Sequence, residues 1–290
     1  MLCICSFAEA QKPGDSSRFC FRISAGYAIE NFNWSIAGNN ENGEPVNILS
    51  ELRWKNIGGP QLGIHGEAYL WKKLSIRGDF YKTFITTGEV TDTDFSGNDR
   101  SDTLFHDTFS SDKGSISGYH GAMGYTFDLA QKHSIKPFVG YGKDSQLLYL
   151  LRDYGNVQGD LKSTYHTQWV GVLTGFDLCV SLHPKLTGRG QFMYHQVKYS
   201  AAADWNLIAD FEHPVSFKHK AKGYGLEAEG ALEYLVRKRV TIVLITRYRY
   251  WTTGPGTDTL FRIGGNTIVT KLNPVHRNSL IFSTGVHVKF

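Results

Sequence analysis

Alternation of apolar and polar residues is the dominant pattern along this chain. In "LSIRGDFYK", Leu74, Ile76 and Phe80 fall on one face of an extended strand, and Arg77 and Asp79 fall on the other. The same alternation recurs in "NILSELRWK", "VTIVLITRYRYW" and "QWVGVLTGFDLCV". Charged residues repeated on the second face are costly in a packed soluble core and normal in a polar barrel lumen or on a solvated sheet face. The pattern therefore predicts an all-β protein.

Ten such segments predict an antiparallel sheet with an even number of strands. Short turns and long polar loops alternate between the segments, which favours a ten-stranded antiparallel transmembrane β-barrel with short periplasmic turns and long extracellular loops. Several segments exceed the residues needed to cross the hydrocarbon core, so we expect the barrel to project beyond the membrane. The predicted strands are roughly 18–35, 45–71, 73–88, 115–128, 133–150, 164–182, 185–204, 215–236, 239–253 and 277–290.

The last strand carries a further signal. In "LIFSTGVHVKF", Phe282, Val286, Val288 and the terminal Phe290 share one face. An alternating final strand that ends in an aromatic residue resembles the assembly signal of bacterial outer-membrane barrels. A soluble β-sandwich is the alternative. We expect location in a bacterial outer membrane, with the long loops exposed at the cell surface.

The amino-terminal residues differ from the rest of the chain. Residues 1–10, MLCICSFAEA, end in an A-x-A pattern, which indicates the remnant of a secretory signal peptide; a disordered terminus is the alternative. Residues 11–290 are then expected to form a single outer-membrane β-barrel domain. Removing residues 1–10 takes away Glu9, so the net charge changes from +4 to +4 − (−1) = +5. This mild basicity gives no argument for a nucleic-acid partner.

Familiar cofactor and metal motifs are missing from the sequence. The chain has no P-loop, no G-x-G-x-x-G followed by a helix and no H-E-x-x-H. His213 and His219 are weak evidence for a metal site, and we expect neither a metal nor a cofactor. Beyond the signal remnant only Cys20 and Cys179 remain, which does not make a disulfide framework.

Several charged residues are predicted to face the lumen. They would fill the lumen with a charge network and so disfavour a wide pore. These residues are Glu51, Arg53, Arg77, Asp79, Arg247 and Arg249.

The segment "TTGEVTDTDF", residues 86–95, raises the question of chemistry. Asp92 and Asp94 stand at i and i+2, where a predicted strand leads into a long polar loop. They are either a catalytic carboxylate pair or two solvated loop residues, because acidic residues are frequent throughout this loop.

Two stretches resemble the omptins, outer-membrane aspartate-type endopeptidases on a ten-stranded barrel. "SELRWK", residues 50–55, looks like the omptin S-x-L-x-W-K, and "TTGEVTDTDF" looks like the omptin segment that contains D-x-D-W, with Phe95 in place of the usual Trp. Where omptins carry a second D-x-H pair, this chain reads "IADFEHPVSF", with Asp210 and His213. Its spacing is one residue longer than in the family.

The resemblance implies roles for four residues. His213 would take a proton from a water molecule, and Asp210 would fix the tautomer of His213. Asp92 would hold the same water, and Asp94 would raise one carboxyl pKa so that the pair shares a proton. The resemblance also implies polypeptide substrates cleaved next to basic residues, and lipopolysaccharide held on the barrel wall as an activating lipid.

Three functions stay open on the sequence. The first is an omptin-like endopeptidase. The second is a non-catalytic barrel that acts as an adhesin or envelope structural protein. The third, a ten-stranded pore, is disfavoured by the predicted charge network.

Overall fold

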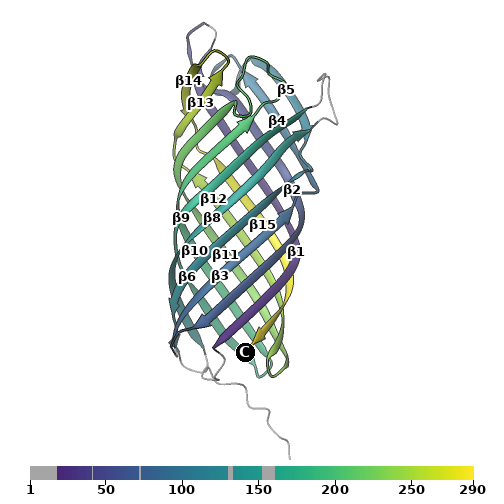
Figure 1. Ribbon diagram of the computed structural model, residues 1–290, viewed down its shortest axis with the longest axis vertical. Coiled ribbons are helices and arrows are strands. Elements are labelled where there is room, and N and C mark those ends of the chain that lie inside the picture. The colour runs from purple at the N-terminus through teal and green to yellow at the C-terminus, as the bar shows by residue number, and fades with distance from the viewer. Residues whose placement is uncertain (1–17, 41, 72, 130–132, 152–160) are drawn as a thin grey trace, which may run out of the picture.

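The described residues form one antiparallel sheet whose strands tilt around a common long axis (Figure 1). The computed structural model describes residues 18–40, 42–71, 73–129, 133–151 and 161–290, so the predicted signal remnant lies outside it. No helix in these ranges is long and apolar enough to cross a membrane. The elements are β1 (Phe19–Asn39), β2 (Pro45–Tyr69), β3 (Leu74–Phe84), β4 (Thr87–Phe95), the 3-10 helix η1 (Asn98–Arg100), β5 (Thr103–Ser110), β6 (Gly114–Tyr125), β7 (Phe127–Asp128), β8 (Ser134–Leu151), β9 (Lys162–His183), β10 (Leu186–Asp204), β11 (Phe217–Arg237), β12 (Val240–Thr253), β13 (Gly256–Arg262), β14 (Asn266–Leu272) and β15 (His276–Lys289).

The strand pairings return to their starting point. Near the end that holds the carboxy terminus, the pairings run β1–β2–β3–β6–β8–β9–β10–β11–β12–β15 and back to β1. We call this the lower circuit. The first and last long strands meet along a seam that extends from Cys20 opposite Lys289 to Asn33 opposite His276.

A second circuit forms at the opposite end. There the pairings run β1–β2–β4–β5–β8–β9–β10–β11–β13–β14 and back to β1, and we call this the upper circuit. The described residues thus hold fifteen strands, where the sequence pattern predicted ten. The predicted loops 89–114 and 254–276 are wrong as loops, because each folds largely into an antiparallel hairpin that continues the wall.

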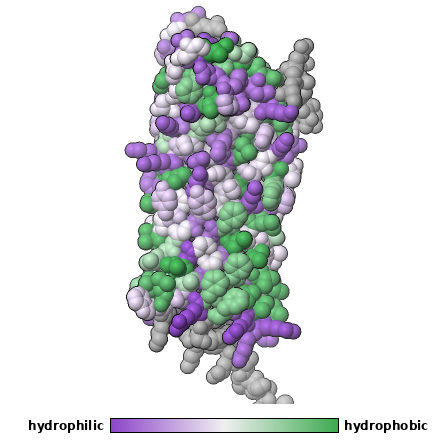
Figure 2. All heavy atoms as spheres, viewed as in Figure 1, coloured by the Kyte–Doolittle hydropathy of each residue, from purple (hydrophilic) through white to green (hydrophobic). Residues whose placement is uncertain are grey.

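Large apolar side chains face outward around the lower circuit. Ile76 and Phe80 on β3, Leu244 on β12 and Phe282 on β15 each leave more than a third of their surface exposed. Figure 2 shows apolar residues concentrated over the lower part of the displayed face and hydrophilic residues over its upper half. An outward apolar band of this kind is the surface that a strand presents to lipid.

The orientation of β2 reverses between its two halves. Leu52 and Trp54 are buried in the interior, so Glu51 and Arg53 lie on the outer face. A bulge between Lys55 and Gly58 shifts the register with β4. A bulge adds one residue to a strand and so exchanges its two faces. The prediction that Glu51 and Arg53 face the lumen is therefore wrong.

The lumen of the lower circuit is filled by buried ion pairs, as predicted for Arg77, Asp79, Arg247 and Arg249. The Arg277 guanidinium Nε lies 2.8 Å from Glu30 Oε2, with side chains 0% and 2% exposed. Arg249 Nε lies 3.1 Å from Glu227 Oε2, also with almost no exposed surface. Such charges are stable inside a protein only when they are paired. The network leaves little room for a water-filled channel.

An aromatic cluster fills the interior above this network. Phe32 packs on Trp54 with ring centroids 5.4 Å apart, and Trp169 meets Trp251 edge-on at 5.7 Å. Tyr165 contacts Phe32, Trp34 and Trp54, and its hydroxyl lies 2.6 Å from that of Tyr199, which packs on Trp169. At the level of this cluster, large apolar residues therefore face inward, whereas around the lower circuit they face outward.

Removing one member of a buried ion pair should destabilise the protein strongly. We expect Glu30→Gln to lower the free energy of unfolding by about 3–5 kcal/mol, because the buried Arg277 loses its carboxylate partner at 2.8 Å and keeps only Asp144, at 3.9 Å. Urea unfolding in lipid vesicles would measure it. The matched control is Asp128→Asn, which breaks the exposed pair with Lys73 and should cost about 1 kcal/mol or less. Equal effects of the two variants would contradict this account.

Close packing against Trp251 predicts a position-specific glycine requirement. A Cβ atom on Gly225 would lie 2.6 Å from the Trp251 ring, whereas one on Gly230 of the same strand meets nothing within 4 Å. We expect Gly225→Ala to cost about 1–3 kcal/mol by overpacking, and Gly230→Ala to be neutral within about 0.5 kcal/mol. Thermal unfolding, followed by the change in electrophoretic mobility, compares the two. A larger loss in Gly230→Ala would refute the packing argument.

Candidate functional site

The predicted D-x-D pair lies within a strand rather than in a loop. Asp92 and Asp94 belong to β4, where Val90 is fully buried in the aromatic cluster. Because strand side chains alternate, both carboxyl groups lie on the same interior face as Val90. Each is half-buried. Both acids therefore point into the interior of the upper circuit, at the end of the barrel opposite the carboxy terminus. We call this end the mouth.

A third acid, Asp107, joins them from the neighbouring strand. Asp107 on β5 stands directly opposite Asp92 on β4, and Phe109 on the same face of β5 is buried. Among the described residues, none of the three carboxyl groups forms an ion pair with a basic side chain. The sequence placed Asp107 among the many acids of a loop. Only the hairpin register singles it out.

Burial and repulsion alter the protonation of this acidic cluster, defined as Asp92, Asp94 and Asp107. Burial, followed by the charges of Asp94 and Asp107, raises the pKa of Asp92 to about 8. Burial also raises the pKa of Asp94, although a hydrogen bond from Ser50 acts in the opposite direction. Asp92 therefore keeps its proton at neutral pH. A carboxyl group perturbed in this way at an open mouth marks a candidate functional site.

The second predicted pair does not form. His213 Nδ1 lies 2.6 Å from Asp204 Oδ1, at the end of β10, and not beside Asp210. The Asp210 side chain is exposed, and its backbone oxygen accepts a hydrogen bond from Ile263 N at 3.1 Å. The expectation that Asp210 orients His213 is wrong in this arrangement. Asp204 was missed because it stands nine positions away, across a loop.

The imidazole and the acidic cluster lie on different faces of the wall. Ala201 and Ala203 are buried in the interior, so alternation places Asp204 on the outer face. In the upper circuit β4 and β11 are opposite each other, five pairings apart in either direction. Among the described residues, no hydrogen bond or ion pair joins His213 to Asp92 or Asp94.

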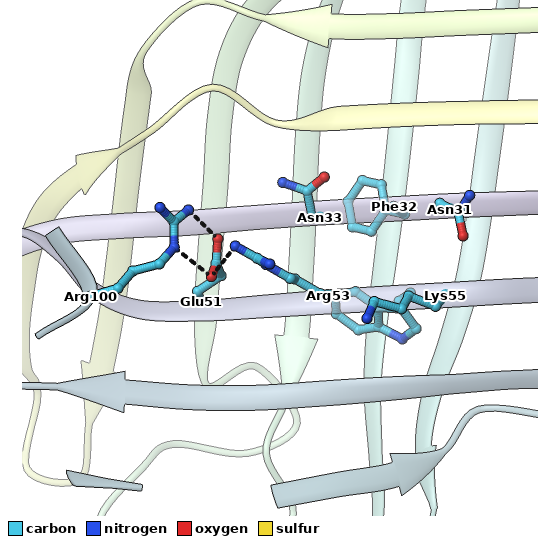
Figure 3. A pocket seen from close by; sticks show the side chains of 8 residues that line it. Asn31, Phe32, Asn33, Glu51, Arg53, Lys55 and Arg100 are labelled. Atoms are coloured by element: carbon cyan, nitrogen blue, oxygen red, sulfur yellow. Dashed lines mark hydrogen bonds and ion pairs between the residues drawn. The ribbon is translucent and has the colours of Figure 1, made fainter. Parts of the chain in front are cut away.

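A basic depression lies on the outer wall near β1, β2 and η1 (Figure 3). Its volume is about 490 Å³, and its lining includes Arg53, Lys55 and Arg100. Glu51 accepts hydrogen bonds from Arg100 at 2.7 and 3.0 Å and contacts Arg53 at 2.8 Å. Burial tends to raise the pKa of Glu51. The hydrogen bonds from Arg100 and Arg53 outweigh this effect, so the pKa is lowered. Three cations against one carboxylate leave the depression positively charged.

Groups of metal-ligand side chains in the described residues lie elsewhere. One consists of Cys20, His65 and Glu67 and the other of His120, His195 and Glu227. Neither group includes a member of the acidic cluster.

A closed antiparallel wall, an outward apolar band and a lumen of paired charges define an outer-membrane β-barrel. The chain belongs to the Protochlamydia outer membrane protein family, whose model matches residues 22–290. Among solved structures, it is similar to the outer membrane protease OmpT from Escherichia coli, with a TM-score of 0.73 and 13% identity over 94% of this chain and 96% of that one.

Two further solved structures are more distant. OprG from Pseudomonas aeruginosa has a TM-score of 0.42 and 10% identity, covering 96% of this chain and 99% of its own. Neisserial surface protein A has a TM-score of 0.31 and 14% identity, covering 94% and 98%. No curated protein matches the sequence. The similarity to OmpT, at this identity, establishes a shared fold only.

The raised pKa of Asp92 predicts a pH dependence of stability. The unfolded chain releases this proton near pH 4, whereas the folded protein keeps it up to about pH 8. The folded state binds more protons in this window, so its stability falls as the pH rises through it. We expect Asp92→Asn to be more stable than the wild type at pH 9, by on the order of 2 kcal/mol.

Urea unfolding at pH 5, 7 and 9 measures this difference. The control is Asp112→Asn, which alters an exposed acid outside the acidic cluster. An unchanged pH slope in Asp92→Asn would show that this carboxyl group does not carry the effect.

Proposed function

We propose that this protein is a surface-exposed outer-membrane barrel that binds cationic groups at its extracellular mouth and does not cleave them. The observation that carries the proposal is the acidic cluster of Asp92, Asp94 and Asp107, which faces the mouth without a cationic partner in the described residues. A ligand with basic side chains would supply that partner, and its binding would favour release of the Asp92 proton. The proposal corresponds to the non-catalytic barrel that the sequence left open as an adhesin or envelope structural protein. It adds Asp107 to the residues of the site.

The membrane placement follows from the two circuits. Ten strands of the lower circuit carry the outward apolar band and would span the bilayer. The turns His183–Leu186 and Arg237–Val240 are short and would face the periplasm, while the β4–β5 and β13–β14 hairpins would project from the cell surface. Residues 11–290 would make up this domain, after a signal remnant at 1–10. The packed lumen argues against ion conduction.

Peptide hydrolysis is the second candidate, because Asp92 stays protonated beside Asp107. An ionised carboxylate can take a proton from a held water while a protonated one donates to the leaving amine. The opposed positions of β4 and β11 match the two walls that the omptin resemblance requires. However, His213 is bound to Asp204 on the outer face. It would have to leave that carboxylate to reach the acidic cluster.

The basic depression supports lipopolysaccharide as a partner. Arg53, Lys55 and Arg100 lie on the outer face, and on the same face of β1 Ile29 leaves 46% of its surface exposed in the apolar band. Phosphate groups at the upper edge of a membrane would meet these cations. The lipid would then contact the outer wall and leave the mouth free for a polypeptide.

Binding and cleavage can be separated in one experiment. The protein, refolded in detergent with lipopolysaccharide, would be given a fluorescent Arg- and Lys-rich peptide. Fluorescence anisotropy measures binding, and mass spectrometry of the same samples detects cleavage. We expect binding without cleavage, affinity that increases from pH 6 to pH 9 as Asp92 ionises, and about a tenfold loss in Asp92→Asn/Asp107→Asn.

Asp112→Asn and a neutral peptide serve as controls. Cleavage by the wild type that disappears in Asp92→Asn, with or without dependence on His213→Ala, would replace the binding proposal by the endopeptidase. Equal binding of basic and neutral peptides would reject the acidic cluster as a ligand site. Ion conductance in a planar bilayer would favour the pore.

A further inference from the structure

Three adjacent strands bring metal-ligand side chains together at the seam of the lower circuit. Cys20 is the second residue of β1 and stands directly opposite Glu67 on β2. His65 and His287 stand opposite Arg22, on β2 and β15 respectively. All of them lie on the lumen face, because their strand neighbours of opposite parity, such as Ile64 and Val286, face outward.

The ligand atoms of these side chains are close enough for a shared ion. One atom each from Cys20, His65 and Glu67 lies within 4.8 Å of the others. The His287 imidazole is also close enough to the Cys20 thiol for the two groups to affect each other's ionisation. Cys20 and His287 are buried, with 8% and 7% of their surface exposed.

His287 supplies an independent sign of a missing partner. Neither of its ring nitrogens makes a hydrogen bond within the described part of the chain. Glu233 Oε1 is 3.6 Å from Nδ1, beyond hydrogen-bonding distance. A buried imidazole whose ring nitrogens lack a hydrogen bond is costly, and a bound ion is one way to satisfy it.

We propose that Cys20, His65, Glu67 and His287 bind a transition-metal cation of the zinc class. One thiolate, two imidazoles and one carboxylate are a donor set that suits tetrahedral Zn²⁺ and is too soft for Ca²⁺ or Mg²⁺. On binding, the Cys20 thiol loses its proton to water and the sulfur becomes the metal ligand. Metal binding leaves the oxidation states unchanged.

The surrounding residues hold these ligands in place. Asp79 Oδ1 lies 2.7 Å from His65 Nδ1, which leaves Nε2 of His65 free for the metal. Ser75 donates a hydrogen bond to Glu67 Oε1, and Lys136 contacts the same oxygen, so Oε2 is the oxygen available to an ion. A carboxylate behind a ligating histidine is the usual support of a zinc site.

The other group of potential ligands is less suited to a metal. There Glu227 is paired with the Arg249 guanidinium at 3.1 Å, and His120 with Asp144 at 2.8 Å. Its one carboxylate faces a guanidinium, much as Glu67 faces Lys136, but the group has no thiol to offer a zinc-class cation. The ion at Cys20 would join β1, β2 and β15, and so fasten the seam between the first and last strands.

Cobalt and zinc binding to the refolded full chain test the site. The protein would carry a tag without histidine, in a Cys3→Ser/Cys5→Ser background, so that Cys20 and Cys179 are its thiols. We expect one Co²⁺ per chain, with a thiolate-to-cobalt charge-transfer band that excess Zn²⁺ removes. Zinc should raise the midpoint of the heat-induced mobility change by about 5 °C.

Variants decide whether the ligands are those named. Cys20→Ala should abolish the charge-transfer band, and His65→Gln and His287→Gln should each weaken Co²⁺ binding at least about tenfold. Cys179→Ala, which alters the other free cysteine, should keep both the band and the thermal shift. A wild type that binds no Co²⁺, or a band that survives in Cys20→Ala, would overturn the proposal. Normal mobility of each unheated variant shows that the barrel has folded.

Discussion

Closure of the sheet between β1 and β15 is the constraint on which the rest of this structure depends. Inside a bilayer no water can satisfy a free backbone N–H or C=O group, so every strand that faces lipid needs two neighbours. The seam from Cys20 to Asn33 supplies that pairing for the first and last strands. Once the wall is closed, each strand has a lumen face and an outer face. Alternate residues along a strand then face the lumen and the outside.

The lumen then becomes a confined space whose charges must balance. Buried guanidinium groups such as Arg277 and Arg249 are tolerated because carboxylates on other strands face them. These pairs link strands that are far apart in sequence, as the contact between Arg277 and Glu30 illustrates. At the mouth the balance changes, since the acidic cluster has no basic counterpart in the described residues. That difference between a neutralised lumen and an unneutralised mouth is the physical basis for placing ligand binding at the mouth.

Above the apolar band the two faces of the wall exchange their character. Trp54 and Leu52 turn inward, and Arg53 turns outward to the solvent. The bulge near Asn56, which has a positive φ of 52°, exchanges the faces of β2 at the upper edge of the apolar band. The two ends of the barrel are thus stabilised by different interactions, aromatic packing above and ion pairing below.

The sequence by itself determined the fold class, most strand positions and the outward apolar faces of the lower strands, because a period of two is a local property of the chain. It also identified Asp92 and Asp94 as residues of interest. The tertiary structure decided what no local pattern contains. A single bulge placed Glu51 and Arg53 on the outer face. The hairpin register placed Asp107 opposite Asp92. The fold of the loop placed His213 beside Asp204 and not beside Asp210. Cys20, His65 and His287 likewise meet only because strands from opposite ends of the chain pair at the seam. Contacts between distant residues depend on register and closure, and these are set by the whole sheet.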